Sequence, residues 1–360
     1  MVSDLLLVGA GHAHLYLVKR ARDLVDAGYR VQLLAPRYFD YSGVASARAT
    51  GVLPDDAGRI DVAALAAGSG VRWHQGTLVG LDQQARVAVT SDGTRMTYDV
   101  LSLNIGSVVS LADVDVHPSV IRVKPLSGLA DLDARIRTAR PPGATVTVVG
   151  GGASGMELSA HLSARGDVAE VRLLHSGSVL GPGLPKGGRR RVARLLASRG
   201  VTVRTGCVVH RIGERETLCV DGTTVPHDVA LLAAGLAAPA LLAELGLGDE
   251  RGVPVRETLQ HADRDEVYAA GDCAHFLPGA LPRIGVHGVR QGPVLLASLL
   301  ARTRGEPSPV YEPQRRALSI LDLGDGVGLA VRGRWWWYGA GALRLKRYID
   351  RRWVRGYTGR

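Results

Sequence analysis

The chain contains two segments in which a short apolar run leads into a glycine-rich turn and then into a helical pattern. Glycine lets the chain turn sharply and lets the backbone approach a pyrophosphate closely, while the helix N-terminus offers free N–H groups to phosphate oxygens. One such turn is weak evidence, but two, each between an apolar strand and a helix, predict an α/β fold with two Rossmann-like dinucleotide-binding domains. The candidate glycines are Gly9 and Gly11 after residues 4–8, and Gly150, Gly152 and Gly155 after residues 145–149.

Both units depart from the usual dinucleotide-binding pattern. His14 occupies the position of the third glycine in the first turn, where glycine normally permits close helix–strand packing. The next strand in each unit ends at Ala35 or at His175, rather than at the acidic residue that usually binds the ribose 2′-hydroxyl. Three interpretations stay open: the hydroxyl is selected in another way, His175 and Ser176 accept a 2′-phosphate, or these strand ends have no cofactor role.

A third element follows far downstream, where an apolar strand at residues 267–270 leads into Gly271 and Asp272. The glycine permits close approach of a ligand, and the carboxylate can accept hydrogen bonds from ligand hydroxyls. A Gly-Asp pair alone is often only a turn. Its order after the two glycine-rich turns, and after the strand and turn at residues 98–107, makes the pattern more specific.

That order resembles the two-dinucleotide flavoprotein fold of the pyridine nucleotide-disulfide oxidoreductase superfamily, over about residues 4–300. The resemblance implies a glutathione-reductase-like fold in which the first glycine-rich turn binds the FAD pyrophosphate and the second binds NAD(P)H. It also implies that Gly106 ends a strand returning to the FAD domain. Gly271 and Asp272 would then contact the ribityl chain of FAD.

Several stretches are similar to the type II NADH:quinone oxidoreductase branch, and especially to the flavoprotein domains found fused to selenide, water dikinase. These stretches are residues 9–14, 40–43, 123–125 and 282–293. The resemblance adds as cofactor-binding candidates His12, Tyr41, Ser42, Gly43, Lys124 and Val286. For Lys124 the alternative is an exposed lysine at a strand end.

The same resemblance suggests three catalytic candidates: Glu157, His287 and Gln291. Glu157 would lie near the contact between nicotinamide and flavin, although an acidic residue in the first turn of a helix is also favoured by the helix dipole alone. In the Ala-Gln-x-x-x-Gln motif of type II enzymes, Gln291 is kept and His287 replaces the first glutamine. His287 would supply a proton to the reduced acceptor, or serve only in packing. This departure leaves the identity of the acceptor open.

Composition excludes several other classes. The chain has 360 residues, three cysteines and no Cys-x-x-Cys pair, so a dithiol reductase, a zinc ribbon and a disulfide framework are not expected. With so few cysteines, we expect reduced thiols and no metal site. We also expect a cytoplasmic protein, because neither a secretory signal nor an apolar run long enough to span a bilayer is present.

The C-terminal residues are strongly basic and aromatic. Residues 332–360 contain nine Lys or Arg and one Asp, which accounts for +8 of the net charge of +10, and four of the five tryptophans lie between residues 335 and 353. On a helix, Leu345, Tyr348, Ile349 and Trp353 would share one face and arginines another. This pattern predicts peripheral attachment to the inner face of the cell membrane. A dimer interface, a lid over the flavin and a nucleic-acid contact are alternatives, although we expect no nucleic-acid partner.

Together these features predict an FAD-dependent NAD(P)H dehydrogenase that passes hydride to flavin and then to a quinone. The FAD domain would comprise residues 1–115 and 256–320, the NAD(P) domain residues 116–255, and a small α+β segment residues 321–360. The alternatives are a soluble flavin oxidoreductase with another acceptor, and a non-catalytic flavin- or nucleotide-binding sensor. A homodimer is possible in each case.

Overall fold

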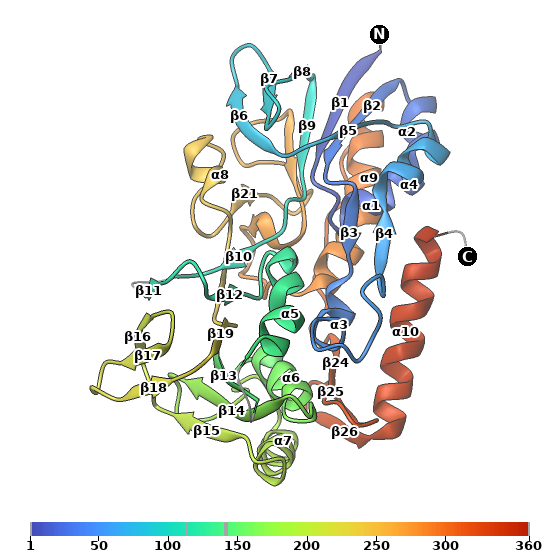
Figure 1. The fold of residues 1–360 in the computed structure, drawn as a ribbon. Helices are drawn as coiled ribbons and strands as arrows, with labels where there is room; N and C mark the ends of the chain where they lie inside the picture. Colours follow the sequence, from blue (N-terminus) through green and yellow to red (C-terminus); the bar gives the residue numbers. More distant parts are fainter. Residues whose placement is uncertain (1, 112–113, 140–142, 359–360) are drawn as a thin grey trace.

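The computed structural model describes residues 2–111, 114–139 and 143–358, which form two parallel sheets and a C-terminal subdomain (Figure 1). Both sheets have five strands, and in both the strand before the glycine-rich turn is central. This arrangement confirms the predicted α/β fold with two dinucleotide-binding domains. The first sheet runs in the order β22 (Val267–Ala269), β9 (Val100–Leu103), β1 (Ser3–Val8), β2 (Tyr29–Ala35), β5 (Arg72–Gln75), and the second in the order β12 (Ile121–Arg122), β19 (Val229–Leu232), β13 (Ala144–Val149), β14 (Val168–His175), β15 (Thr202–Thr205).

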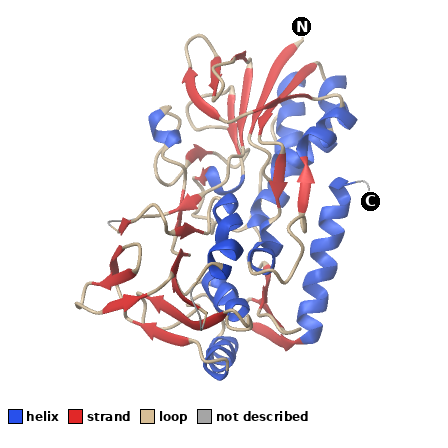
Figure 2. Ribbon diagram, viewed as in Figure 1, coloured by secondary structure: helices blue, strands red, loops and turns tan. Residues whose placement is uncertain are grey.

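The first sheet is buried between layers. Leu5, Leu6 and Leu7 of β1 are fully buried, as expected for a parallel strand covered on both faces. The helices α1 (His12–Lys19), α2 (Ala21–Asp26), α4 (Val62–Ser69) and α9 (Gly285–Arg304) lie to one side of this sheet in Figure 2. The antiparallel strands β6 (Leu78–Asp82), β7 (Val87–Thr90) and β8 (Arg95–Thr97) lie to the other side.

The second sheet has its own core with helices α5 (Leu132–Arg137), α6 (Ala153–Leu162) and α7 (Lys186–Ser198). Residues between Ala238 and Val255 pack in the first core, ahead of the predicted start of the second FAD-domain segment at residue 256. Short elements complete both domains: β3 (Tyr38–Asp40), η1 (Ser42–Val44), α3 (Ala45–Ala49), β4 (Arg59–Asp61), β10 (Val108–Val109), β11 (Asp115–Val116), η2 (Leu126–Asp131), β16 (Val209–Ile212), β17 (Glu216–Cys219), β18 (Thr224–Pro226), β20 (Leu236–Ala237), α8 (Leu241–Glu244), β21 (Val253–Val255), η3 (Gly271–Cys273) and β23 (Ala274–Phe276).

The C-terminal subdomain packs against both nucleotide-binding domains. Strands β24 (Leu318–Asp322), β25 (Gly328–Arg332) and β26 (Trp335–Gly339) form an antiparallel sheet whose Leu321 and Leu329 join the second core. The following helix, α10 (Ala340–Thr358), then runs along the side of the molecule to the first domain (Figure 1). No helix among the described residues is long and apolar enough to cross a membrane.

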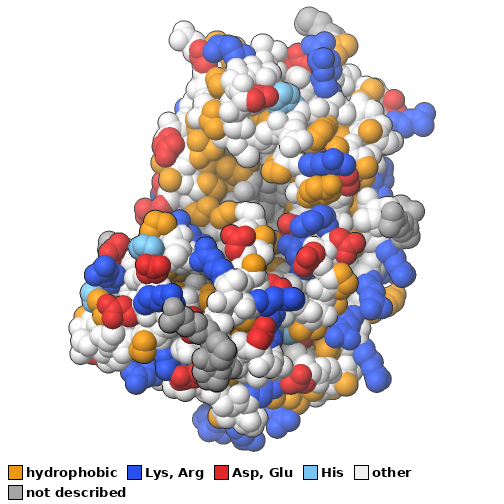
Figure 3. All heavy atoms as spheres, in the orientation of Figure 1, with side chains coloured by type: hydrophobic (Ala, Val, Ile, Leu, Met, Phe, Trp, Pro, Cys, Tyr) orange, Lys and Arg blue, Asp and Glu red, His pale blue; other side chains and the backbone are white. Residues whose placement is uncertain are grey.

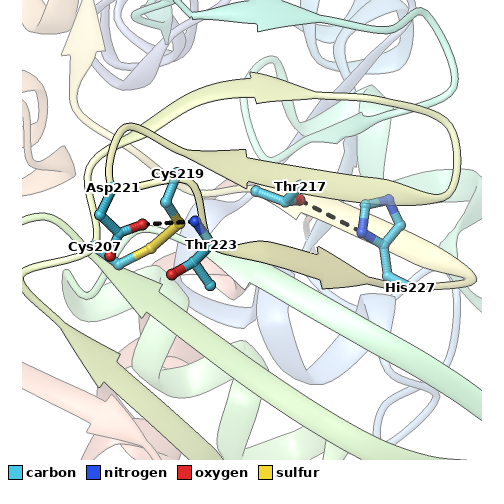
Figure 4. Close-up of a disulfide and its surroundings, with 6 residues drawn as sticks. All are labelled: Cys207, Thr217, Cys219, Asp221, Thr223 and His227. Carbon is cyan, nitrogen blue, oxygen red and sulfur yellow. Dashed lines mark hydrogen bonds between the residues drawn. A yellow bond between two sulfur atoms is a disulfide. The ribbon is translucent and has the colours of Figure 1, made fainter.

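The second domain contains a disulfide between Cys207 and Cys219, so the expectation of reduced thiols is wrong for this pair (Figure 4). Strands β16 and β17 form a hairpin in which Val209 lies opposite Cys219, and this pairing brings the Cα atoms of the two cysteines to 6.0 Å. The sequence separation of 12 residues gave no sign of this proximity. The third cysteine, Cys273, is buried with a free thiol.

Candidate functional site

The first glycine-rich turn joins β1 to α1 where the backbone passes close to Asn104. Gly9 has φ +85°, and a Cβ atom there would lie 2.6 Å from the Asn104 carbonyl oxygen. A Cβ atom on Gly11 would lie 2.4 Å from Oδ1 of Asn104. Both contacts are too short for any side chain, so this turn requires glycine at the two predicted positions.

Asn104 is a site residue that the sequence analysis did not select. Its Oδ1 accepts hydrogen bonds from the backbone nitrogens of Ala13 at 3.1 Å and His14 at 3.2 Å, at the start of α1. Its Nδ2 donates to the carbonyl oxygen of Ala270 at 2.5 Å. Asn104 therefore joins the first turn to the Gly-Asp element. Its sequence signal is a polar residue directly after the fully buried apolar strand β9.

His14 replaces the third glycine by making hydrogen bonds of its own. Its Nδ1 lies 2.7 Å from the carbonyl oxygen of Gly9, and its Nε2 lies 2.8 Å from Oγ of Ser102. Burial lowers the pKa of His14 to about 4, against a smaller opposing effect of the Gly9 carbonyl. His14 is therefore a neutral structural residue that holds the turn against the sheet.

The second glycine-rich turn is equally constrained. Gly150 has φ +121°, and a Cβ atom there would lie 2.3 Å from the carbonyl oxygen of Ala233. A Cβ atom on Gly155 would lie 1.8 Å from the carbonyl oxygen of Gly150, which shows the close helix–strand packing expected of the third glycine. Gly152 differs, because a Cβ there would have no neighbour within 4 Å among the described residues. This position is open toward an incoming ligand.

The two strand ends that lack an acidic residue have different surroundings. Ala35 is buried, and its carbonyl oxygen accepts a hydrogen bond from Nε1 of Trp73 at 3.1 Å. His175 lies over the second turn, where its Nδ1 accepts a hydrogen bond from the backbone nitrogen of Gly151 at 3.3 Å. The imidazole is therefore held against the backbone of the second glycine-rich turn.

The Gly-Asp element brings several predicted residues together. Gly271 has φ +72°, and its backbone nitrogen donates to Oε1 of Gln291 at 2.6 Å. The carboxylate of Asp272 accepts a hydrogen bond from the hydroxyl of Ser107 at 2.8 Å. Ser107 directly follows Gly106, which has φ +77°. Nζ of Lys124 lies 3.9 Å from the Asp272 carboxylate. The carboxylate thus has a fixed orientation beside a cation.

A cavity of about 510 Å³ lies beside this element, and Figure 3 shows the molecule hollowed near the middle of one face, with hydrophobic side chains around the hollow. Its wall includes the predicted residues Gly271, Asp272, His287 and Gln291. Much of the remainder is apolar, with Leu236, Ala237, Ala274, Phe276, Ala280, Leu281 and Pro282. Val286 lies in the first turn of α9, directly before His287.

His287 and Gln291 lie one helical turn apart on α9, on the side away from α1. Nδ1 of His287 lies 2.8 Å from the hydroxyl of Tyr311, a residue that the sequence analysis did not select. Tyr311 belongs to the loop between α9 and β24, and nothing local in the sequence marks it. The helix face toward α1 consists instead of Gly285, Gly288 and Gly292, where side chains of His12 and Tyr16 pack.

Glu157 lies apart from this cavity. Its Oε1 accepts a hydrogen bond from the backbone nitrogen of Asp322 at 2.7 Å, and its Oε2 accepts one from the Ser46 hydroxyl at 3.3 Å. Burial raises the pKa of Glu157, against the lowering effect of nearby Lys346. Glu157 therefore connects α6 with both the C-terminal sheet and α3. The structure brings two of the three catalytic candidates together and places the third at a domain junction.

The C-terminal helix covers the predicted cofactor residues of the first domain. The ring of Trp353 stacks on Tyr41 at 4.7 Å between centroids and lies 4.9 Å from the ring of His12. The hydroxyl of Tyr41 donates to Asp350 at 3.0 Å. Burial lowers the pKa of His12 to about 4, and Lys124 contributes in the same direction.

The adjacent residues Ser42 and Gly43 form η1, and the carbonyl oxygen of Gly43 accepts a hydrogen bond from Nζ of Lys346 at 2.5 Å. Nζ of Lys346 also donates to Asp350 at 2.9 Å. This segment is thus held by a buried ion pair within α10.

These residues fit a bound FAD. The Gly9–Gly11 turn leaves no room for a side chain and meets a helix N-terminus, which suits a pyrophosphate. The fixed carboxylate of Asp272 suits a ribityl hydroxyl, and the N-terminus of α9 suits a developing negative charge on a flavin ring. The open position at Gly152 suits a second dinucleotide.

Comparisons with known proteins agree with this geometry. The family model for pyridine nucleotide-disulphide oxidoreductases matches residues 3–293. The chain is 24% identical to ferroptosis suppressor protein 1 of Taeniopygia guttata over 72% of this chain and 71% of that protein. It is 29% identical to the rubredoxin-NAD(+) reductase of Alcanivorax borkumensis over 77% of this chain and 75% of the relative. It is also 29% identical to the type II NADH:quinone oxidoreductase of Haemophilus influenzae, over 37% of this chain and 33% of that protein.

Among solved structures, the sulfide:quinone oxidoreductase of Aquifex aeolicus has the same fold, with a TM-score of 0.82 and 17% identity over 99% of this chain and 92% of that chain. The family match spans both glycine-rich turns and the Gly-Asp element, which are the features that carry the resemblance in the sequence. The chain therefore belongs to the pyridine nucleotide-disulphide oxidoreductase family, whose members use FAD with NAD(P)H.

Proposed function

We propose that this protein is an FAD-dependent NAD(P)H dehydrogenase that reduces a quinone. The observation that carries this proposal is the largely apolar cavity of about 510 Å³ that adjoins both the Gly-Asp element and the N-terminal turn of α9. A flat, apolar molecule with polar carbonyl groups matches a wall that combines these apolar side chains with polar and charged ones. The cavity lies beside Asp272, and this position suits electron transfer from a flavin held at the Gly-Asp element.

The chain's own residues bind and orient the reactants. The turn at Gly9 and Gly11 would hold FAD through its pyrophosphate, and the turn at Gly150 and Gly152 would hold NAD(P)H. A bound flavin supplies the hydride chemistry, accepting two electrons from the donor and passing them to the acceptor. The backbone N–H groups at the start of α9 would stabilise negative charge on a bound flavin ring.

The direct test is an absorption spectrum of the purified protein before and after addition of NADH or NADPH, followed by a short-chain benzoquinone. We expect a flavin spectrum that bleaches with a donor and recovers with quinone. Asp272→Ala should reduce the flavin content, while Asp221→Ala, in an exposed turn, should not. A colourless protein that takes up no added FAD would overturn the proposal, and bleaching that quinone does not reverse would overturn its acceptor.

A small redox protein is the second candidate acceptor. The relative from Alcanivorax borkumensis is named a rubredoxin-NAD(+) reductase, and Lys and Arg side chains gather along the edges of this molecule over α10 and α7 (Figure 3). A basic surface suits an acidic protein partner. Reoxidation of the bleached protein by rubredoxin, faster than by quinone, would favour this second function.

We further propose that the C-terminal subdomain attaches the protein to the cytoplasmic face of the cell membrane. Trp335, Trp337 and Tyr348 are 81%, 51% and 60% exposed, and exposed arginines flank them. Aromatic and basic side chains together favour the headgroup region of an anionic bilayer. Trp353 does not contribute as predicted, because it faces His12 and Tyr41.

Co-sedimentation with vesicles of anionic phospholipid tests this attachment. The double variant Trp335→Ser/Trp337→Ser should bind at least tenfold more weakly than the unmodified protein, whereas Val220→Ser, at a 67% exposed position in the second domain, should bind normally. Equal sedimentation of all three proteins would contradict the proposal.

The homodimer and the closer similarity to flavoprotein domains fused to selenide, water dikinase stay predictions.

A further inference from the structure

The hydrogen-bonded pair of His287 and Tyr311 lies outside both glycine-rich turns, beside the Gly-Asp element. His287 contributes to the wall of the cavity beside the Gly-Asp element, and its Nδ1 lies 2.8 Å from the Tyr311 hydroxyl. Both side chains are buried, at 7% and 4% exposure. Because Nδ1 is engaged, Nε2 is the ring nitrogen left for a molecule in the cavity.

Tyr311 is held firmly in this position. Its backbone nitrogen donates to the carbonyl oxygen of Glu257 at 2.8 Å, which fixes the loop between α9 and β24. Its ring packs edge-to-face on Phe276, with centroids 5.7 Å apart, and Phe276 itself lines the cavity. The hydroxyl is thus placed behind His287, one hydrogen bond away from the cavity.

The protonation states of the pair suit proton donation. Burial lowers the pKa of His287, with Arg290 acting in the same direction and Asp272 opposing it, so the imidazole is neutral at pH 7. Burial raises the pKa of Tyr311, against a smaller effect of Arg290, so the phenol keeps its proton. A phenol that donates to Nδ1 leaves the imidazole proton on Nε2. The other charged groups around the cavity are Glu250, Arg251, His275 and Arg283.

We propose that His287 and Tyr311 form a proton relay that delivers the second proton to a quinone bound in this cavity, an inference that rests on the quinone acceptor proposed above. Conversion of a quinone to a quinol takes two electrons and two protons. A hydride brings both electrons and one proton, so one proton has to come from the protein. An O–H bond forms on the quinone as the Nε2–H bond of His287 breaks, Nδ1 takes the proton of Tyr311, and water restores the phenol.

Quinone reduction needs this relay, whereas reduction of a one-electron acceptor such as ferricyanide does not, because ferricyanide takes no proton. His287 is then a catalytic residue that contacts the acceptor, and Tyr311 is a positioning residue that acts through it. The type II resemblance expects a glutamine in place of His287, so the relay is a property of this chain's own residues.

The test is stopped-flow reoxidation of photoreduced holoprotein, which requires no nicotinamide donor, by a short-chain benzoquinone and separately by ferricyanide. Tyr311→Phe keeps the packed ring and removes the hydroxyl, and His287→Gln is the second variant. The matched control is Tyr29→Phe, which removes another buried hydroxyl that donates to α9, at the carbonyl oxygen of Leu299. We expect Tyr311→Phe and His287→Gln to slow quinone reduction at least tenfold, with ferricyanide reduction within twofold of normal.

Two further readouts separate catalysis from folding. Binding of the quinone to the oxidised Tyr311→Phe protein, measured by calorimetry, should stay within threefold of normal, and the slowing of quinone reduction in D₂O should disappear in that variant. Equal loss of the quinone and ferricyanide rates, or no loss of either, would overturn the relay. Failure of quinone to oxidise the unmodified photoreduced protein would overturn both the relay and the acceptor, whereas failure of NAD(P)H alone would overturn only the donor.

Discussion

The side-chain oxygen of Asn104 accepts a hydrogen bond from the backbone nitrogen of Ala13 at 3.1 Å, across 91 residues of sequence. This contact satisfies a donor in the first turn of α1, and the same amide reaches the carbonyl oxygen of Ala270 before the Gly-Asp element. One side chain therefore sets the spacing between the two segments proposed to hold the pyrophosphate and the ribityl chain of FAD.

Asn104→Ala should lower both stability and flavin content. The substitution leaves buried backbone groups without their partner, which costs about 1–3 kcal/mol of unfolding free energy. Urea unfolding and the ratio of flavin to protein absorbance measure the two effects. Gln32→Ala, which removes an amide from the same domain away from the turn, is the control. Equal flavin content in both variants would show that Asn104 does not organise the site.

The buried His14 should make the protein sensitive to mild acid. Its folded pKa of about 4 lies below its ordinary value of 6.5, so between these values the unfolded state binds a proton that the folded state does not. Stability from this residue is complete above pH 6.5 and falls by up to about 3 kcal/mol as the pH drops toward 4.

Urea unfolding at pH 7 and pH 5 measures this loss. His14→Gln should be less stable than the unmodified protein at pH 7, with a smaller further loss at pH 5, while the exposed His210→Gln should follow the unmodified protein at both values. The interpretation fails if His14→Gln and the unmodified protein lose the same stability on acidification.

The buried pair of Lys346 and Asp350 should fix α10 over the first domain. Both residues are under 10% exposed, and the carboxylate also accepts a hydrogen bond from Tyr41. Asp350→Ala leaves a buried cation without its partner and should destabilise the protein by about 3–5 kcal/mol. The double variant Lys346→Met/Asp350→Leu should recover most of that loss.

Differential scanning fluorimetry and urea unfolding check the order of these stabilities. Arg351→Ala, next to Asp350 on the exposed side of α10, should change the unfolding free energy by less than about 0.5 kcal/mol. A double variant as unstable as Asp350→Ala would show that packing, rather than the unpaired charge, holds the helix.

Glu157 should act at the domain junction through its charge as well as its hydrogen bonds. Its raised pKa means that the folded state disfavours the ionised carboxylate, so its contribution to stability declines as the pH rises through its pKa. Glu157→Gln can keep a hydrogen bond to Asp322 N and one to Ser46, and should be at least as stable as the unmodified protein at pH 8. Glu157→Ala loses both bonds and should lose about 1–3 kcal/mol.

Stopped-flow reduction by NADH or NADPH then tests for a role with the donor. If Glu157 contacts the nicotinamide, the Gln variant should reduce its flavin at least tenfold more slowly, while the exposed Glu216→Gln remains normal. A normal rate in the Gln variant would leave Glu157 a structural residue of the junction.

The elements that the sequence predicted correctly are those with local chemistry. An apolar strand, a turn that only glycine can form and an amphipathic helix follow one another within about 20 residues, so their order is readable along the chain. The turns at Gly9 and Gly150, and the Gly-Asp turn at Gly271, all have the positive φ values that such a reading requires.

Residues whose partners come from distant segments were not readable in this way. The amphipathic pattern placed Trp353 with Tyr348 on one face of α10, but Tyr41 and His12 from the first domain provide Trp353 with a buried contact. The pairing of Cys207 with Cys219 was missed although only 12 residues separate them, because it depends on how β16 and β17 pair in the hairpin.

By itself, the sequence determined the two dinucleotide-binding units and their glycine positions, because each depends on backbone geometry within a short stretch. The order of these parts along the chain carried the resemblance to the family. The tertiary structure decided which polar groups face one another: Asn104 with Ala13, Glu157 with Asp322, and His287 with Tyr311. These partners lie between 24 and 165 residues apart, and their contact depends on how the sheets and the loop after α9 pack together.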